Sequence, residues 1–255
     1  MSEIQSLMRG LQIVDLIWQA GRSVSITELA EALDVDKSSA SRLVKTLVSA
    51  GYLQPERGSR KYVVGPRLYQ MGWELVNRMP LREKARKYLY RLVKDTEECA
   101  HTAVYSEGKA LMIDDVEASH SLRVVGGIGR MLPMHCTAVG KTLLAFGELP
   151  LPATLERKMP NTLTDPDELA RHLAQVCEQG YAIDDEEHQP GVRCLAAPVY
   201  NMAGIAVAAI GISGPSVRVT KERIAVLAGH VRRAARELSA ELGYDDEEAK
   251  HDDRV

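Results

Sequence analysis

The residue types best suited to chemistry lie together between Gly180 and Asn201, in the segment GYAIDDEEHQPGVRCLAAPVYN. Four consecutive acids, Asp184 to Glu187, are followed by His188 and Cys194. Carboxylates, an imidazole and a thiol are the groups that acid–base and nucleophilic catalysis require. The first hypothesis for this segment is therefore an enzyme site.

The spacing within this segment argues against a metal site and against a thiol enzyme. Neighbours on an extended backbone point to opposite faces, so few of residues 184–188 could converge on one ion. A thiol enzyme needs a base and an orienting acid beside its cysteine, but a Pro-Gly turn separates His188 from Cys194. We predict no metal and no catalytic residue. An enzyme that uses Cys194 or the Asp184–Glu187 cluster on a small acid remains the alternative.

Two glycine-containing segments resemble phosphate-binding loops without completing them. Gly140-Lys141-Thr142 has the end of a P-loop, but the first glycine should stand at position 135, which is His. Gly126, Gly127 and Gly129 begin a dinucleotide fingerprint, yet position 132 is Leu. We therefore predict no nucleotide cofactor, and no other cofactor.

Charge is distributed unevenly along the 255 residues. Residues 1–92 carry 15 Lys and Arg against 9 Asp and Glu, whereas residues 93–255 carry 17 against 26. A chain of this length is expected to form two domains, and only the first has a charge that suits a polyanion. Because its positive excess is modest, useful affinity for nucleic acid needs several copies, so we expect an oligomer.

Cysteine spacing and hydropathy predict the environment of the chain. Cys99, Cys136, Cys177 and Cys194 form no CxxC pair, which favours reduced thiols. The N-terminus has no signal-peptide pattern, and no apolar run approaches the roughly 18 residues of a membrane helix. We expect a cytoplasmic protein outside the membrane. Residues 245–255 hold six acids and two bases, a composition typical of a disordered acidic tail.

Three helices are predicted at the N-terminus. The first ends at Gly21, a capping box at Ser25–Glu28 begins the second, and Asp36 caps a third that Gly51 ends. A tight turn between the last two is typical of a helix-turn-helix. The residues of the first helix predicted to face the core are Ile4, Leu7, Leu11, Val14 and Trp18.

The remaining face of the third helix carries no acid and suits the major groove of DNA. Short hydroxyls allow close approach, Arg42 can bind a guanine edge, and Lys45 can meet a phosphate. Strand, turn and strand between Tyr52 and Val64 then predict a basic wing. The candidate DNA-binding residues are Lys37, Ser38, Ser39, Ser41, Arg42 and Lys45 on the helix, and Arg57, Arg60 and Lys61 on the wing.

The rest of the chain is predicted to be an α+β domain. A helix over 66–78 precedes a second helix that begins at Leu81, whose basic residues we interpret as a solvated surface. Antiparallel strands flanked by helices favour a sensor-like fold. Strands are expected at 101–106, 110–116, 121–126, 192–200 and 205–213, and helices at 137–146, 166–179 and 220–242.

Two segments resemble the IclR-type transcriptional regulators, and the resemblance extends to about Tyr244. The first consists of Gly180, Asp184, Glu187, Cys194, Leu195, Ala196, Val199, Tyr200 and Asn201; the second runs from Leu132-Pro-Met-His135 into Gly140-Lys141 and a helix. The resemblance implies a winged helix-turn-helix for operator DNA over 1–65, a linker helix over 66–80 and a GAF-like effector-binding domain over 81–244. It also implies assembly into dimers or tetramers.

The same resemblance implies that a small organic acid of a catabolic pathway binds the C-terminal domain and modulates operator binding. Amides at the start of the 137–146 helix can receive an anionic group, and Ser213 offers a hydroxyl. Gly211 removes a donor that some relatives have as Ser. A DNA-binding architectural protein without an effector is a further alternative. The implied pocket residues are Leu132, Met134, Ala138, Val139, Asp184, Val192, Cys194, Gly211 and Ser213.

Overall fold

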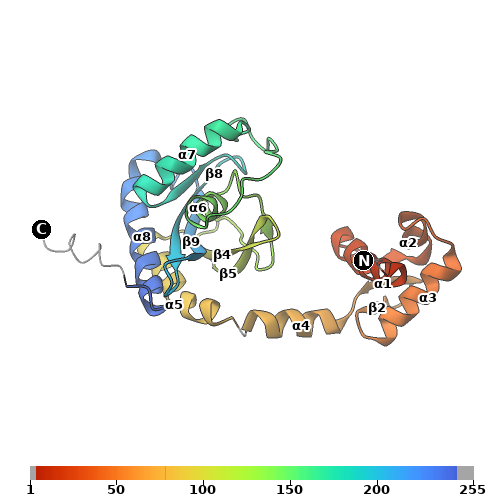
Figure 1. Cartoon of the computed structure of the whole chain (residues 1–255). Helices are drawn as coiled ribbons and strands as arrows, with labels where there is room; N and C mark the ends of the chain where they lie inside the picture. Colours follow the sequence, from red (N-terminus) through yellow and green to blue (C-terminus); the bar gives the residue numbers. More distant parts are fainter. Residues whose placement is uncertain (1–3, 78, 246–255) are drawn as a thin grey trace, which may run out of the picture. The chain divides into compact units, whose positions relative to one another are not determined.

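The computed structural model describes residues 4–77 and 79–245, and the chain divides between residues 78 and 79 into two compact units. Figure 1 draws the first unit in red to orange and the second in yellow to blue. Within the described ranges no helix is both long enough and apolar enough to cross a membrane. The predicted acidic tail lies, except for Asp245, outside the described residues.

The first unit combines helices with a small antiparallel sheet. Its elements are α1 (Gln5–Ala20), β1 (Val24–Ser25), α2 (Ile26–Ala32), α3 (Lys37–Ser49), β2 (Leu53–Pro55), β3 (Lys61–Val64) and α4 (Pro66–Asn77). The strand order is β1-β3-β2, and β2 and β3 form the wing. The predicted capping box begins α2: the Glu28 amide donates to Ser25 Oγ over 3.3 Å, and the Ser25 amide donates to Glu28 Oε2 over 2.8 Å.

The face of α1 that packs into the core is not the predicted one. Ile13 and Ile17 are buried in the cluster that also holds Leu29 and Val44. The predicted core residues Ile4, Leu7, Leu11 and Trp18 are instead 54–67% exposed. The helix has two apolar stripes with the same helical spacing, so periodicity alone could not identify the one that α2 and α3 cover.

The second unit is a six-stranded antiparallel sheet with helices on both faces. The strand order is β6-β5-β4-β9-β8-β7. Helices α5 and α8 cover one face, and α6 and α7 cover the other (Figure 1). The elements are α5 (Pro80–Thr96), β4 (Cys99–Ser106), β5 (Lys109–Val116), β6 (Met131–Leu132), α6 (Ala138–Phe146), α7 (Pro166–Gln179), β7 (Ala182–Asp185), β8 (Val192–Tyr200), β9 (Ala206–Pro215), η1 (Lys221–Arg223) and α8 (Ile224–Glu241).

The prediction of a strand over 121–126 is wrong. Those residues belong to a loop, and the short strand that pairs with β5 is β6, at Met131 and Leu132. Gly129 has a φ of +86°, a backbone conformation that residues with a side chain rarely adopt. Its amide donates to the carbonyl of Met112 over 2.8 Å. The loop therefore turns back onto β5 and reaches the sheet only at β6.

The basic residues Arg86 and Lys87 of α5 are exposed, in agreement with the predicted solvated surface, but they also make ion pairs that the sequence did not predict. Arg86 Nη1 lies 2.8 Å from Oδ1 of Asp114, and Asp114 is fully buried on β5. Lys87 Nζ lies 2.6 Å from Oε2 of Glu241 on α8. The acids that pair with α5 are distant in sequence, so the helix pattern alone did not reveal them.

Side chains alternate between the two faces of the sheet along β8, and this alternation determines which of them face α6. Leu195 and Ala197 pack toward α5 and α8, whereas Cys194 and Ala196 pack toward α6. Cys194 pairs with Ser213 on β9, which therefore shares its face. The small side chains on this face leave a cavity beside the start of α6.

Candidate functional site

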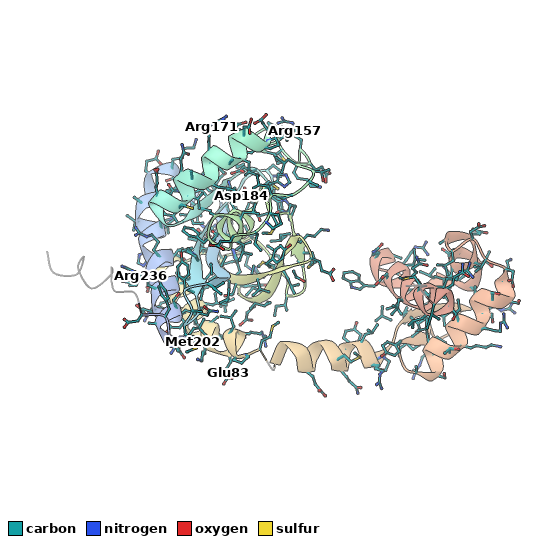
Figure 2. All side chains as sticks on the ribbon, in the orientation of Figure 1. Glu83, Arg157, Arg171, Asp184, Met202 and Arg236 are labelled. Carbon is teal, nitrogen blue, oxygen red and sulfur yellow. The ribbon has the colours of Figure 1, made fainter. Side chains whose placement is uncertain are left out.

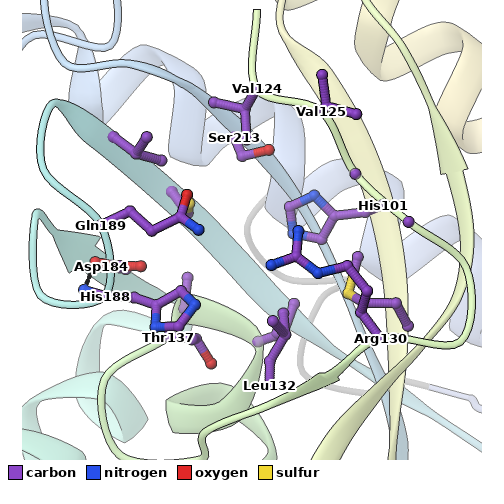
Figure 3. Close-up of a pocket in the computed structure, with 17 residues that line it drawn as sticks. His101, Val124, Val125, Arg130, Leu132, Thr137, Asp184, His188, Gln189 and Ser213 are labelled. Atoms are coloured by element: carbon purple, nitrogen blue, oxygen red, sulfur yellow. Dashed lines mark hydrogen bonds between the residues drawn. The ribbon is translucent and has the colours of Figure 1, made fainter. Parts of the chain in front are cut away.

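A cavity opens on the α6 side of the sheet in the second unit (Figure 3). It offers about 70 Å³ to the centre of a water molecule. This exceeds the roughly 10–15 Å³ that a single water needs, so the cavity can admit a small molecule. Seven of the residues implied by the resemblance line it: Leu132, Ala138, Val139, Asp184, Val192, Cys194 and Ser213.

The other two implied pocket residues, Met134 and Gly211, are not among the described residues that line this cavity. Met134 is 2% exposed and belongs to the apolar cluster under α6. At Gly211 an added Cβ would lie 2.2 Å from the carbonyl oxygen of Leu195. Close approach of two strand backbones therefore explains the glycine there.

The start of α6 presents backbone donors to the cavity. Thr137 caps the helix, because its Oγ1 accepts from the amide of Gly140 over 3.1 Å and donates to the carbonyl of Pro133 over 2.7 Å. The amides of Ala138 and Val139, in the first turn, have no acceptor among the described residues. Both residues line the cavity, so these donors are available to an anionic group.

Asp184 is the buried carboxyl group of the cavity, and its side chain lies inside the second unit (Figure 2). Its Oδ1 accepts from the amides of Glu187, over 2.8 Å, and His188, over 3.3 Å. Burial raises the pKa of Asp184 to about 7; the two amides and Lys141 oppose this shift, and the charge of Glu187 adds to it. The protonated form of Asp184 is therefore favoured well above the pH at which an exposed carboxyl group ionises.

The other acids of the cluster stabilise the turn between β7 and β8. Asp185 Oδ1 accepts from Nε of Arg193 over 2.8 Å, and Glu186 Oε2 accepts from the amide of Gly191 over 2.7 Å. Glu187 pairs with Lys141. Over residues 4–77 and 79–245 no group of three or more His, Cys, Asp or Glu residues is arranged to hold a metal ion.

Cys194 has the properties of a cavity wall rather than of a nucleophile. Burial, with the nearby charges of Asp184 and Glu187, raises the pKa of its thiol well above the usual value, so the thiolate is disfavoured. His188, the base of the enzyme hypothesis, has its Nδ1 4.0 Å from Sγ of Cys136 instead. The thiol-enzyme alternative therefore lacks an activated nucleophile.

Several cavity residues were not predicted from the sequence. His188 was considered only as a catalytic base, but it lines the cavity beside Gln189. His101 on β4, Thr137 and Arg130 do so as well (Figure 3). The Gly-rich loop that ends at Arg130 was considered only as an incomplete dinucleotide fingerprint. Its position just before the Leu132–His135 motif was the one signal that could have identified it.

The predicted DNA-binding residues lie on α3 and on the wing. Arg42 and Lys45 are exposed on α3, and Arg57 and Arg60 are exposed at the turn between β2 and β3, with Lys61 partly exposed. On α3, Lys37 and Ser38 are also exposed, and Ser39 and Ser41 are partly exposed.

The serine hydroxyls at the start of α3 are engaged by its N-cap. The hydroxyl of Ser39 donates to Oδ2 of Asp36 over 2.7 Å, and that of Ser38 donates to Oδ1. These bonds hold the pKa of the Asp36 carboxyl well below its usual range. Contact with DNA by these two hydroxyls would therefore use their acceptor lone pairs or require them to rotate.

A winged helix-turn-helix joined to an α+β unit that contains a cavity is the architecture of a DNA-binding transcriptional regulator with an effector-binding domain. Residues 6–57 match the IclR helix-turn-helix domain, and residues 73–240 match the family described as bacterial transcriptional regulator IclR C-terminal. The chain therefore belongs to the IclR family of transcriptional regulators, which are DNA-binding proteins and not enzymes.

Relatives of this family match the chain along nearly its whole length. HTH-type transcriptional regulator BhcR of Paracoccus denitrificans (strain Pd 1222) is 35% identical over 92% of this chain and 86% of the relative. HTH-type transcriptional regulator XynR of Escherichia coli (strain K12) is 35% identical over 94% and 98%. The crystal structure of Thermotoga maritima IclR is 29% identical, with a TM-score of 0.75, and the match covers 95% of this chain and 100% of that one.

Proposed function

We propose that the chain binds a palindromic operator as a homodimer or a dimer of dimers, and that a small organic acid in the cavity changes its operator affinity. Residues 1–65 bind the DNA, 66–80 link the domains, and 81–244 form the GAF-like sensor. The observation that supports the ligand part is the cavity, whose lining includes Ala138 and Val139, with their unpaired amides, and Ser213 with its hydroxyl. Donors without protein acceptors favour an acceptor-rich ligand.

DNA recognition is assigned to α3 and the wing. Arg42 reads a base edge in the major groove, and Lys45 contacts a phosphate. Arg57, Arg60 and Lys61 meet the backbone beside the groove, where they fix the register of the protein. Because the operator lies on the chromosome, the protein acts in the cytoplasm.

The exposed stripe of α1 supports self-association. Ile4, Leu7, Leu11 and Trp18 expose large apolar side chains on one helix of the first unit. An apolar stripe of this kind marks an interaction surface. A symmetric partner that covers the same stripe would place two copies of α3 on two operator half-sites.

The test begins with the DNA sequence that the full chain selects from a pool of random duplexes. Binding of that duplex is then compared for wild type, Arg42→Ala and Arg171→Ala by fluorescence anisotropy. Arg171→Ala is the control, because it removes one positive charge from an exposed residue of α7, in the second unit (Figure 2). Arg42→Ala should weaken binding at least tenfold, whereas Arg171→Ala should bind as wild type does.

Two results would overturn the proposal. Selection of no preferred sequence, or equal binding by Arg42→Ala and wild type, would remove α3 from DNA recognition. If DNA binds as proposed but no small acid raises the melting temperature of the chain, the sensing role fails. The protein would then fit the architectural alternative.

A further inference from the structure

The charges around the cavity are unbalanced. His101, Arg130, Asp184 and His188 are the lining residues that could carry charge near neutral pH. Burial lowers the pKa of His101 to about 4 and also lowers the pKa of His188, so both imidazoles are neutral. Among the described lining residues Arg130 alone has a permanent positive charge, and it makes no ion pair with any described residue.

Donors reach the cavity from more than one side. Thr137, at the start of α6, lies on the same side as Asp184, whereas Arg130 and His101 point in from the side of β4 and β5 (Figure 3). His101 and Ser213 are each 7% exposed, and neither side chain forms a hydrogen bond with a described residue. Buried polar groups without protein partners are costly unless a ligand or water satisfies them.

We propose that the ligand is a small dicarboxylate, one carboxylate of which binds the amides at the start of α6 while the other binds the guanidinium of Arg130. This inference rests on the proposed sensing function and specifies its ligand class. A dianion offers one carboxylate to the donors on each side of the cavity. The small volume of the cavity favours a short acid.

Asp184 is compatible with a dianion because of its protonation. Its Oδ1 is occupied by the amides of Glu187 and His188, which leaves Oδ2 to carry a proton. The pKa of Asp184, raised to about 7 by burial, makes that proton available at neutral pH. A protonated Asp184 donates to a carboxylate, and a nearby anion increases its proton affinity further.

The experiment compares matched acids by isothermal titration calorimetry on the full chain. Malonate is paired with propionate, and malate with 3-hydroxybutyrate, so that each pair differs by one carboxylate. The variants are Arg130→Ala, Arg130→Lys and, as control, Arg123→Ala. Arg123 lies on the same loop, but its Nε is 2.8 Å from Oε2 of Glu117, so its charge is already paired.

The proposal expects the dicarboxylate of at least one pair to bind wild type about tenfold more tightly than its monocarboxylate, as a charge-assisted bond implies. Arg130→Ala should abolish the preference for the dicarboxylate and leave the affinity for the monocarboxylate within about twofold of the wild-type value. Arg130→Lys should retain part of the preference, and Arg123→Ala should retain all of it. Equal affinity for both acids in wild type, or an unchanged preference in Arg130→Ala, would overturn this inference alone. Absence of binding by all four acids would overturn it while other acids could still support the sensing function.

Discussion

The ammonium group of Lys141 donates to Oε1 of Glu187 in the interior of the second unit, where the two side chains are 0% and 7% exposed. Lys141 lies on α6 and Glu187 in the turn between β7 and β8, so the pair joins two walls of the cavity. Because a buried charge without a partner is costly, Glu187→Leu should lower the free energy of unfolding of the second unit by about 3–5 kcal/mol. Scanning calorimetry of the full chain would measure the loss.

The control is the double variant Lys141→Met with Glu187→Leu. Removing both charges leaves no orphaned ion, so most of the lost stability should return. If the double variant were as unstable as Glu187→Leu alone, the penalty would come from packing and not from the charge of Lys141.

Much of the fold could be predicted from the sequence because local signals determine it. The capping box of Ser25 and Glu28, the Asp36 cap and the strands predicted at 192–200 and 205–213 depend on residues close in the chain, and the structure contains all of them. The prediction of the buried face of α1 was wrong because the helix has two apolar stripes, and only tertiary packing determines which one is buried.

The cavity was harder to predict than the fold. Asp184 and Cys194 came from a resemblance, and strand alternation places both beside α6. His101 looked like an ordinary strand residue, and Arg130 belongs to a loop whose path depends on contacts with β5. No local pattern predicts that these two residues meet around one cavity.

Stability should depend on pH through Asp184. Its folded pKa of about 7 lies above the ordinary value of 3.8, so the folded chain holds the proton more tightly than the unfolded chain. This contribution to stability is complete below pH 3.8 and is lost as the pH rises through about 7. Glu187, His188, Lys141 and Cys194 surround the group, and Asp184→Asn leaves all four unchanged.

Asp184→Asn isolates this effect, because the amide oxygen can still accept from the turn. Urea unfolding between pH 5 and pH 8 should show wild type losing about 2 kcal/mol more than Asp184→Asn. Parallel pH profiles for the two proteins would mean that Asp184 stays ionised across this range.

Operator affinity should fall steeply with salt, because cations on α3 and the wing displace counterions from the phosphates. Arg57→Ala should weaken binding similarly for all DNA sequences. It should also lower the slope of log affinity against log salt concentration by about one for each subunit bound. Anisotropy titrations across a range of KCl concentrations measure this slope. An unchanged slope would remove Arg57 from the phosphate contacts.

The exposed stripe of α1 should be an association surface. Leu11 is 54% exposed, so Leu11→Asp should leave the first unit folded while it charges the stripe. Sedimentation velocity should then show a smaller assembly than wild type, and operator affinity should drop with it. Retention of the wild-type assembly would assign self-association to another surface.

The most direct test measures operator binding with and without ligand in a chain whose cavity is filled. Ala138→Trp would place a large side chain at the start of α6, where Ala138 lines the cavity. At least one small dicarboxylate should change the operator affinity of wild type by about 5-fold or more, whereas Ala138→Trp should still bind the operator but not respond. A wild-type protein that ignores every such acid, or an Ala138→Trp variant that responds as wild type does, would contradict the claim that this cavity controls DNA binding.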